Sequence, residues 1–365
     1  MAVPAENAQL QPPPFHSWLT NYGERPYFSP DGTRIAFIAE NYGDAHEVDL
    51  ATGAIRPLTD ELGEHHSFLR VLYLSNGDYL LIGPAEFDGD RDRARHVESE
   101  LWILDRALQT PPVRLGRRIF EGAGVSTIRP RITYAVNGRQ DPSLGGNDVF
   151  ECHVTEIEYG PDGPYLGEDT VFYRTRGGRA PEPQDFRHDD TEVIFAEYHR
   201  SGRNPFAPEP VCTVRGYQLT TGTHVTYVEE ARVHNECEGI FPDHDYMCLE
   251  SDCDSGFPPR DLWKLALDGS GRRARMTAMP RESDWRATNS NVSPDGETLA
   301  FMLNRRNDEA GLGRGIGLLD LRAWEASNPQ WENPTSRVAD QLPSYPYPNS
   351  EPFDWDAHSG RPAPR

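Results

Sequence analysis

The sequence predicts an all-β protein that folds as a single β-propeller of six four-stranded antiparallel blades, with seven blades as the alternative. Two observations carry this prediction: one hairpin turn occurs near both ends of the chain, and weaker copies of it lie between them at a nearly regular spacing. Composition agrees, because the 365 residues include 32 glycines and 32 prolines. Such frequent turn formers indicate many short elements and argue against long helices.

The repeated turn is the tetrad Ser-Pro-Asp-Gly, at residues 29–32 and again at 293–296. Proline presets φ at the first corner, aspartate hydrogen bonds to nearby backbone, and glycine accepts a positive φ. In both copies apolar residues precede the turn and an alternating strand follows it, as in a β-hairpin. One hairpin is weak evidence, but its repetition indicates a repeat architecture.

Weaker copies of the turn lie at Gly77, Asp190 and His244, so that the units repeat at about 45 to 55 residues. The longest interval holds two units, and we expect its degenerate turn at Arg129-Pro130. Each unit also has a third and a fourth strand, for example residues 46–50 and 55–58 in the first unit. Four antiparallel strands repeated in this way are typical of a propeller, in which ring closure gives every blade two neighbours.

The propeller is expected to span residues 22–322. Residues 1–21 form an N-terminal segment that is a candidate to close the ring, through a strand at Phe15–Leu19. Residues 323–365 are rich in proline and aromatic side chains and show little periodicity. We expect this C-terminal segment either to pack on the outside of the propeller or to pair with the N-terminal segment.

Charge and hydropathy exclude several classes of partner. The chain has 58 acidic and 36 basic residues and a formal charge of −22, which disfavours nucleic acids and anionic membranes. No apolar run is long enough to span a bilayer. The first residues do not resemble a signal peptide, which predicts a cytoplasmic protein, or a secreted one whose signal peptide has been removed. We expect a small-molecule or glycoside ligand and a monomer or weak homo-oligomer.

One face of the ring is predicted to carry the function. In a propeller, the segment that leads into each innermost strand and the loop between the second and third strands open on the same face. Here these loops are long and polar, at residues 84–99, 137–148, 198–210, 251–260 and 304–314. The opposite face carries the tight turns, so the long loops indicate the working face.

The densest group of ionisable residues on this face is His234-Asn-Glu236-Cys-Glu238. Glu236 and Glu238 are two residues apart on a predicted strand, which places their carboxyl groups on one face at roughly 6–7 Å. Two such carboxylates would push their pKa values apart and provide one proton donor and one acceptor. The alternative is that both form ion pairs with arginines such as Arg286 across the channel.

A divalent metal is a second hypothesis for the mouth, although the sequence requires no cofactor. His66 enters from one blade and His234 from another, so the two could meet across the channel and bind a metal with Glu236. The five cysteines match no zinc spacing and are expected to be reduced and buried. No dinucleotide or phosphate-binding fingerprint follows a strand and opens a helix, which argues against nucleotide cofactors.

The hairpin repeat resembles the TolB-like (WD40-like) propellers, whose units centre on a Ser-Pro-Asp-Gly turn, over about residues 22–322. Residues 285–296 and 308–316 are similar to the last blade of saponin-hydrolase-like propellers, and residues 236–243 to an earlier blade. This narrower resemblance implies cleavage of a glycosidic bond in a glucuronide-type or terpenoid glycoside. Related propellers cleave uronates by elimination.

The resemblance implies roles for residues at the mouth. Glu236 and Glu238 would act as acid and base, or as acid and nucleophile, with His234 and His66 as further catalytic candidates. Tyr22 and Trp285 would stack on sugar or terpene rings. Guanidinium groups that could hold a substrate carboxylate belong to Arg25, Arg70, Arg286 and Arg305.

Two other functions remain open from the sequence. A propeller with a polar mouth can bind a protein or a small ligand without catalysis, because the fold by itself does not specify an activity. A secondary-metabolite tailoring enzyme, of cyclase or lyase type, would use the same mouth. No Gly-x-Ser-x-Gly motif points to a serine hydrolase.

Overall fold

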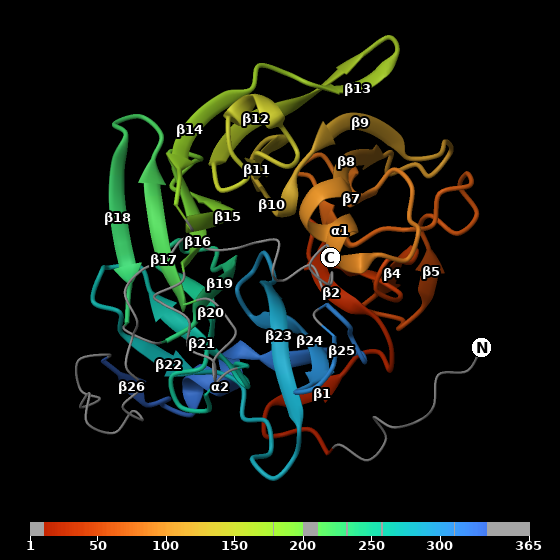
Figure 1. The fold of residues 1–365 in the computed structure, drawn as a ribbon. Coiled ribbons are helices and arrows are strands. Elements are labelled where there is room, and N and C mark those ends of the chain that lie inside the picture. The colour runs from red at the N-terminus through yellow and green to blue at the C-terminus, as the bar shows by residue number, and fades with distance from the viewer. Residues whose placement is uncertain are drawn as a thin grey trace, which may run out of the picture.

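The computed structural model describes residues 11–177, 179–199, 211–230, 233–256, 258–309 and 311–333. Its strands form six antiparallel sheets, which Figure 1 shows arranged as a ring around a central axis. The predicted all-β propeller is confirmed, with six blades rather than seven. Chain order follows the ring, so each blade is built from a nearly continuous stretch of sequence.

The first three blades cover residues 24–175, and in each the first strand is innermost. Blade one contains β2 (Glu24–Phe28), β3 (Arg34–Ile38), β4 (Ala45–Asp49) and β5 (Ile55–Pro57). Blade two contains β6 (Arg70–Tyr73), β7 (Tyr79–Pro84), β8 (Ser99–Leu104) and β9 (Val113–Arg118). Blade three contains β10 (Phe120–Val125), β11 (Arg131–Asn137), β12 (Phe150–Gly160), β13 (Gly163–Leu166) and β14 (Thr170–Thr175).

The last three blades follow the same order. Blade four contains β15 (Arg179–Arg187), β16 (Glu192–His199), β17 (Val211–Gln218) and β18 (Thr223–Val228). Blade five contains β19 (Asn235–Ile240), β20 (Tyr246–Ser251), β21 (Asp261–Ala266) and β22 (Arg273–Arg275). Blade six contains β23 (Trp285–Val292), β24 (Thr298–Arg305) and β25 (Ile316–Asp320).

The N-terminal segment completes the sixth blade. Strand β1 (His16–Trp18) pairs antiparallel with β25, with His16 opposite Leu319 and Trp18 opposite Gly317. The two ends of the propeller are therefore joined by backbone hydrogen bonds. After β25 the chain forms helix α2 (Leu321–Ala326), and β26 (Trp331–Glu332) then pairs with β22 of blade five. The described part of the C-terminal segment thus packs on blade five, while residues 334–365 lie outside the described residues.

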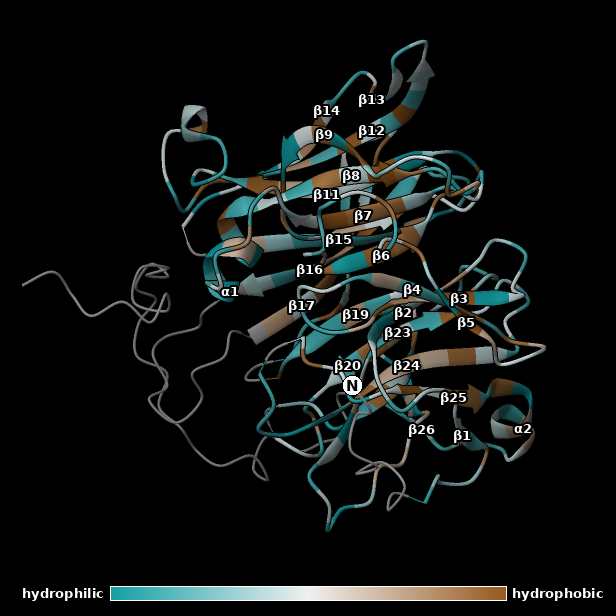
Figure 2. Cartoon of the chain, turned by 90° about the vertical axis from the view of Figure 1, so that its right-hand side faces the viewer, coloured by the Kyte–Doolittle hydropathy of each residue, from teal (hydrophilic) through white to brown (hydrophobic). Residues whose placement is uncertain are grey.

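The hydrophobic core is divided among the interfaces between blades. One buried cluster joins blades one and two through residues such as Phe68, Tyr79 and Trp102. Another joins blades six and one across the ring closure, through Phe37 and Ile316. Figure 2 shows the strands carrying most of the apolar residues and the connecting loops largely polar. Stability of the ring therefore comes from packing between blades, which leaves the central channel free to hold polar groups.

The two Ser-Pro-Asp-Gly turns have the predicted geometry. In the first, Ser29 Oγ donates to Asp31 Oδ1 at 2.6 Å and Gly32 has a φ of 69°. In the second, Gly296 has a φ of 74° and its N–H donates to the Ser293 carbonyl at 2.8 Å. A Cβ on Gly32 would lie 3.4 Å from Pro294, so the two turns are neighbours across the ring closure.

The remaining features agree with the prediction except for one helical loop. A hairpin joins β10 to β11 at residues 126–130, where the degenerate turn was expected. All five cysteines are buried, and they form no disulfide among the described residues. The loop from β7 to β8 forms the short helices α1 (Arg91–Arg93) and η2 (Ala94–Glu98), which the sequence analysis did not predict. No helix among the described residues is long and apolar enough to cross a membrane.

Candidate functional site

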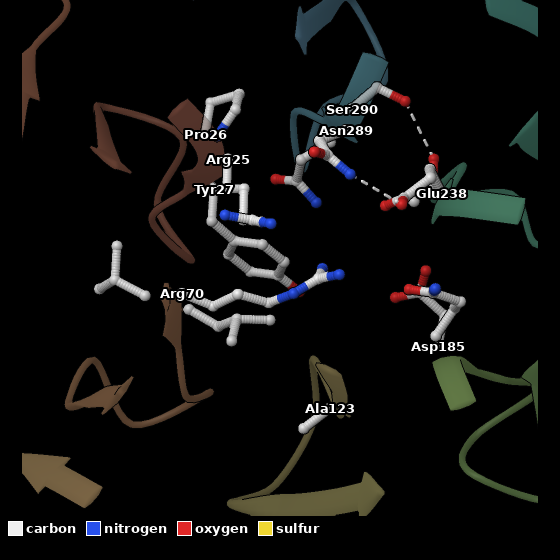
Figure 3. Close-up of a pocket in the computed structure, with 14 residues that line it drawn as sticks. Arg25, Pro26, Tyr27, Arg70, Ala123, Asp185, Glu238, Asn289 and Ser290 are labelled. Atoms are coloured by element: carbon white, nitrogen blue, oxygen red, sulfur yellow. Dashed lines mark hydrogen bonds between the residues drawn. The ribbon is translucent and has the colours of Figure 1, made fainter. Parts of the chain in front are cut away.

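All six innermost strands line one cavity in the central channel. Its volume is about 40 Å³, and Figure 3 shows the side chains that surround it. The lining residues are 25–27 of β2, 70–72 of β6, Ala123 of β10, 184–185 of β15, 238–239 of β19 and 289–291 of β23. Because the innermost strands start at the mouth, the residues that come earlier in each strand form the layer above this cavity.

Irregular backbone re-aims side chains where the innermost strands start. The pairing register shifts in β2, β10 and β23 at the point where each strand meets the channel. Arg25, Glu121 and Asn289 lie within these bulges, with φ values of 52°, 58° and 43°. Positive φ in a residue other than glycine is strained, and such residues concentrate at functional sites. Three blades therefore carry the same backbone strain at the same end of the channel, each with a polar side chain.

A connected group of side chains lies at the mouth, and we call Arg70, Glu182, Tyr198, His234 and Glu236 the mouth cluster. Arg70 Nη2 donates to Glu182 Oε1 at 3.1 Å. The hydroxyl of Tyr198 lies 2.9 Å from Glu182 Oε2 and makes a short contact with Glu236 Oε1. Glu236 Oε2 then lies 2.9 Å from His234 Nε2. These contacts join blades two, four and five in one hydrogen-bonded chain.

The contacts of Tyr198 require a proton on one of its two carboxyl neighbours. A phenol has one proton to donate, so with both carboxyls ionised one carboxylate oxygen would face an oxygen lone pair. Burial and the charge of Glu121 raise the pKa of Glu182 to about 7. Burial also acts to raise the pKa of Glu236, but its contacts with His234 and Tyr198 outweigh burial and lower it. Of the two carboxyls, Glu182 therefore binds a proton more readily, and Tyr198 donates to Glu236 whenever Glu182 carries it.

A second charged group stands beside the mouth cluster and comes from the helical loop. Arg95 and His96 of η2 both contact Glu121, with Arg95 Nε at 2.7 Å from Oε2 and His96 Nε2 at 2.8 Å from Oε1. Burial opposes the charge of His96, but its contacts with Asp92 and Glu121 raise its pKa to about 9. Burial likewise acts to raise the pKa of Glu121, and Arg95 and His96 outweigh it and hold that pKa well below its ordinary value. This group is therefore fully charged at neutral pH.

Glu238 and Glu250 occupy the side of the channel next to blade six. Glu238 accepts a hydrogen bond from Asn289 Nδ2 at 3.0 Å, and Glu250 accepts one from the Asn289 backbone N–H at 2.6 Å. Burial raises the pKa of Glu238 well above its ordinary value. Burial and the charge of Glu236 raise the pKa of Glu250 to about 7. The pKa of Glu236 is thus lowered and that of Glu238 raised, and the catalytic roles of both residues stay a prediction.

Five predicted site residues come together at the channel: Arg25, Arg70, His234, Glu236 and Glu238. The carboxyl groups of Glu236 and Glu238 turn to different neighbours, the first to blade four and the second to blade six. Arg286 forms no ion pair with Glu236 or Glu238 among the described residues: its Nε donates to the Pro259 carbonyl at 2.6 Å, and it interacts with Glu236 and Glu250 only through longer-range electrostatics.

His66 does not join the mouth cluster as the sequence analysis expected. Its Nδ1 lies 2.9 Å from Asp44 Oδ1 and its side chain is exposed. Asp44, Asp60 and His66 bring three possible ligand atoms within 4.8 Å of one another, and they are the group among the described residues that could hold a metal ion. The expected metal set of His66, His234 and Glu236 is therefore wrong. Adjacent residues on an extended segment point to opposite sides, and here His65 is the one that packs inward, stacked on Trp102.

Three predicted ligand-binding residues also have other partners. Trp285 is 6% exposed and packs in the core between blades five and six, so it does not offer a stacking surface to a sugar. Its ring is covered by the guanidinium of Arg305, 4.9 Å from the ring centroid. Tyr22 packs edge-on against Phe37 and its hydroxyl lies 3.1 Å from His46 Nδ1. The strand-end positions were right, but side-chain direction could not be taken from strand position alone.

Several site residues were missing from the predicted set. Glu182 lies on β15, the innermost strand of blade four, and was not among the predicted residues. Tyr198 starts one of the long mouth loops, and Arg95 and His96 lie in another. Glu121 opens blade three, whose degenerate turn left the start of its innermost strand unassigned. The sequence feature that could have identified Glu121 is the segment Phe120–Gly124, in which a single glutamate interrupts an otherwise uncharged strand. This strand begins directly after the last strand of blade two.

No protein-family model and no curated protein matches this sequence. Solved structures do resemble it, among them an oligogalacturonate lyase from Vibrio parahaemolyticus, with 10% identity over 84% of this chain and 93% of the other and a TM-score of 0.46. A gluconolactonase from Xanthomonas campestris has 11% identity over 84% and 88%, with a TM-score of 0.47. TolB from Acinetobacter baumannii has 13% identity over 78% and 63%, with a TM-score of 0.42. The chain therefore resembles TolB and other β-propellers in fold, and its function has to be argued from its side chains.

Proposed function

We propose that the protein is an acid–base enzyme that cleaves the glycosidic bond of a uronic-acid-containing sugar at the mouth of the channel. The observation that carries this proposal is the chain Glu182–Tyr198–Glu236, in which one hydroxyl contacts two carboxyl groups whose pKa values are shifted in opposite directions. Paired carboxyl groups with separated pKa values are the usual basis of acid–base catalysis near neutral pH. Arginines beside the pair supply the partner for a substrate carboxylate.

A ligand can reach the ionised member of the pair. The side chain of Glu236 is 17% exposed, that of Arg70 is 11% exposed and that of Arg95 is 20% exposed. Glu182 is 1% exposed and lies behind them. The base and two guanidinium groups are therefore partly accessible from the solvent, whereas the carboxyl of Glu182 is covered. Guanidinium groups bind carboxylates through paired hydrogen bonds, which favours a uronate over a neutral sugar.

The arrangement favours elimination over hydrolysis. Hydrolysis by two carboxyl groups needs both of them to flank the scissile bond. Glu238, the second carboxyl predicted for this role, is 4% exposed and faces the cavity below the mouth. Elimination needs one base next to a neutralised carboxylate, and Glu236 beside Arg70 supplies that combination.

In the elimination step, Glu236 removes the proton on the carbon next to the substrate carboxylate. The electron pair of that C–H bond forms a carbon–carbon double bond, and the bond from the adjacent carbon to the glycosidic oxygen breaks. The leaving oxygen takes a proton from an acid or from water, so the products are an unsaturated uronate and a sugar with a new reducing end. Tyr198 and Glu182 keep the base ionised before the step and share the proton that Glu236 receives.

The test is a panel of oligouronides and aryl glucuronides, with products followed by the ultraviolet absorbance of an unsaturated uronate and by reducing ends. The proposal predicts turnover that produces the ultraviolet signal, and a loss of about 10² to 10⁴-fold in kcat/KM for Glu236→Gln. Glu47→Gln is the matched control, because the buried Glu47 of blade one accepts hydrogen bonds from Tyr73 and Tyr79 of blade two and from Arg56 of its own blade. It should change the melting temperature and leave kcat/KM within a few-fold.

Three outcomes separate the candidate functions. Reducing ends without the ultraviolet signal would replace elimination by hydrolysis. Binding of a uronide without any turnover would favour the non-catalytic binding propeller. Full activity in Glu236→Gln would refute the assignment of the base.

A further inference from the structure

The cavity below the mouth is lined by three residues with buried N–H donors that have no hydrogen-bond acceptor. They are Arg25 Nε, Arg70 Nε and Gln184 Nε2, each inaccessible to solvent and without a partner among the described residues. All three residues line the same cavity, although they come from β2, β6 and β15. Arg25 is 5% exposed and Arg70 is 9% exposed. A buried donor without an acceptor is costly, so three around one space indicate a ligand that accepts hydrogen bonds.

The carboxyl groups on the other side of the cavity form no ion pair with these arginines among the described residues; the paired carboxyls are Glu24 for Arg25, at 3.6 Å, and Glu182 for Arg70, at 3.1 Å. Figure 3 shows Arg25 and Arg70 reaching toward the centre, with Asp185 and Glu238 facing them. Burial raises the pKa of Asp185 to about 7 and that of Glu238 well above its ordinary value. Both carboxyls are therefore largely protonated below neutral pH and can donate hydrogen bonds. The cavity then has positive charge and donors on several sides.

We propose that this cavity is a binding site for a small monovalent anion, held between Arg25, Arg70 and Gln184, and that the natural occupant is a carboxylate. Its volume of about 40 Å³ corresponds to about three water molecules, and a carboxylate group has three heavy atoms. The group is either the substrate carboxylate inserted from the mouth or a free carboxylate such as formate. The first case rests on the proposed function, whereas the second does not.

Arg70 connects this anion site to the mouth cluster. Its Nη2 donates to Glu182 and the residue also lines the cavity, so one side chain belongs to both layers of the channel. An anion in the cavity competes for the charge of Arg70 and thereby raises the pKa of Glu182. Occupancy of the cavity therefore favours the protonated form of Glu182, the form that the hydrogen bonds of Tyr198 require.

Bromide and formate test the site directly. Crystals soaked in sodium bromide should show an anomalous peak within hydrogen-bond distance of both Arg25 Nε and Arg70 Nε. In solution, sodium formate should raise the melting temperature in a saturable way, at an ionic strength held constant with sodium sulfate, since a ligand that binds the folded state stabilises it. No peak in the cavity, together with no difference between formate and sulfate, would overturn the proposal.

Gln184→Glu is the sharper variant, because it places a carboxylate of the same size into the cavity. The proposal predicts a melting temperature at least equal to wild type without formate, and loss of the saturable rise when formate is added. Arg70→Met should lose that rise as well. A formate response of wild-type size in Gln184→Glu would contradict the proposal.

Competition distinguishes the two sources of the carboxylate. If the substrate inserts its own carboxylate, formate inhibits turnover competitively and raises KM without changing kcat. If a free anion occupies the site, formate changes kcat and the substrate does not displace bromide. Anion binding in a protein that turns over no uronide would refute the proposed function and support the anion site. Turnover of a uronide without anion binding would refute the anion site and support the proposed function.

Discussion

The hydroxyl of Tyr198 is the smallest group whose removal separates the two members of the carboxyl pair. Tyr198→Phe keeps the ring and deletes one oxygen, which lies 2.9 Å from Glu182 and makes a short contact with Glu236. Glu236 then retains His234 as its partner, at 2.9 Å. We expect the fold to persist and the pKa of Glu236 to rise, because an ionised carboxylate loses one of its donors.

The size of the shift follows from the lost hydrogen bond. A hydrogen bond to a charged group contributes about 1.5–3 kcal/mol, and one pKa unit corresponds to about 1.4 kcal/mol. The pKa of Glu236 should therefore rise by about 1–2 units. Because Glu236 acts in its ionised form, the acidic limb of the kcat/KM profile should move to higher pH by the same amount.

The assay is the pH dependence of kcat/KM for the uronide that wild type turns over. Tyr227→Phe is the matched control, since Tyr227 donates to buried Glu192 in blade four, away from the channel. Its acidic limb should coincide with that of wild type. An unshifted limb in Tyr198→Phe, with the control behaving as expected, would refute the assignment of Glu236 as the base.

Three further predictions concern stability and the corrected role of one histidine. Burial raises the folded-state pKa of Asp185 to about 7, so its contribution to stability is fully present below about pH 4 and is lost as the pH rises toward 7. In urea unfolding, the free energy of unfolding of wild type should therefore fall by an amount on the order of 4 kcal/mol over this range, and Asp185→Asn should remove that fall. Equal pH dependence of the unfolding free energy in wild type and variant would contradict this. Trp18→Ala should destabilise the protein by about 2–4 kcal/mol, because β1 closes the ring, and an unchanged urea midpoint would argue against closure by this strand. His66→Ala should leave kcat/KM within a few-fold of wild type, because His66 contacts Asp44 outside the mouth cluster, and a loss above tenfold would return it to the site.

The fold could be predicted from sequence because its signals are local. A Ser-Pro-Asp-Gly turn specifies a hairpin through its own backbone preferences, and two copies set the phase of all the repeats. Even the degenerate turn at Arg129-Pro130 was located by spacing. The face that carries the long polar loops followed from this phase, and with it the presence of Arg25, Arg70 and Glu236 at the channel.

The partners of each side chain could not be predicted in the same way. A β-bulge changes the direction of a side chain without a strong sequence signal, and Glu121 and Asn289 both lie in bulges. The contact of Tyr198 with two glutamates joins separate strands of the ring, so it depends on how the blades are set relative to one another. Trp285 was expected to face a sugar because it stands at a strand end, but packing between blades buries it.

Buried charge in the channel is tolerated because the blades are held together elsewhere. Burial raises the pKa of Glu24 to about 7 and lowers that of Arg25 to about 10. Both shifts disfavour the charged forms, even though Arg25 Nη1 lies only 3.6 Å from Glu24 Oε1. Such groups destabilise a fold, and proteins retain them mainly where they serve a function. The apolar clusters between blades supply the compensating stability.

The central claim is that Glu182 holds a proton that Tyr198 connects to an ionised Glu236. Infrared titration measures it most directly, through the C=O stretching band of protonated carboxyl groups in wild type and Glu182→Gln. We expect the wild-type spectrum to contain a component that persists to about pH 7 and is missing from Glu182→Gln. Identical protonated-carboxyl bands in the two proteins across this range would contradict the account.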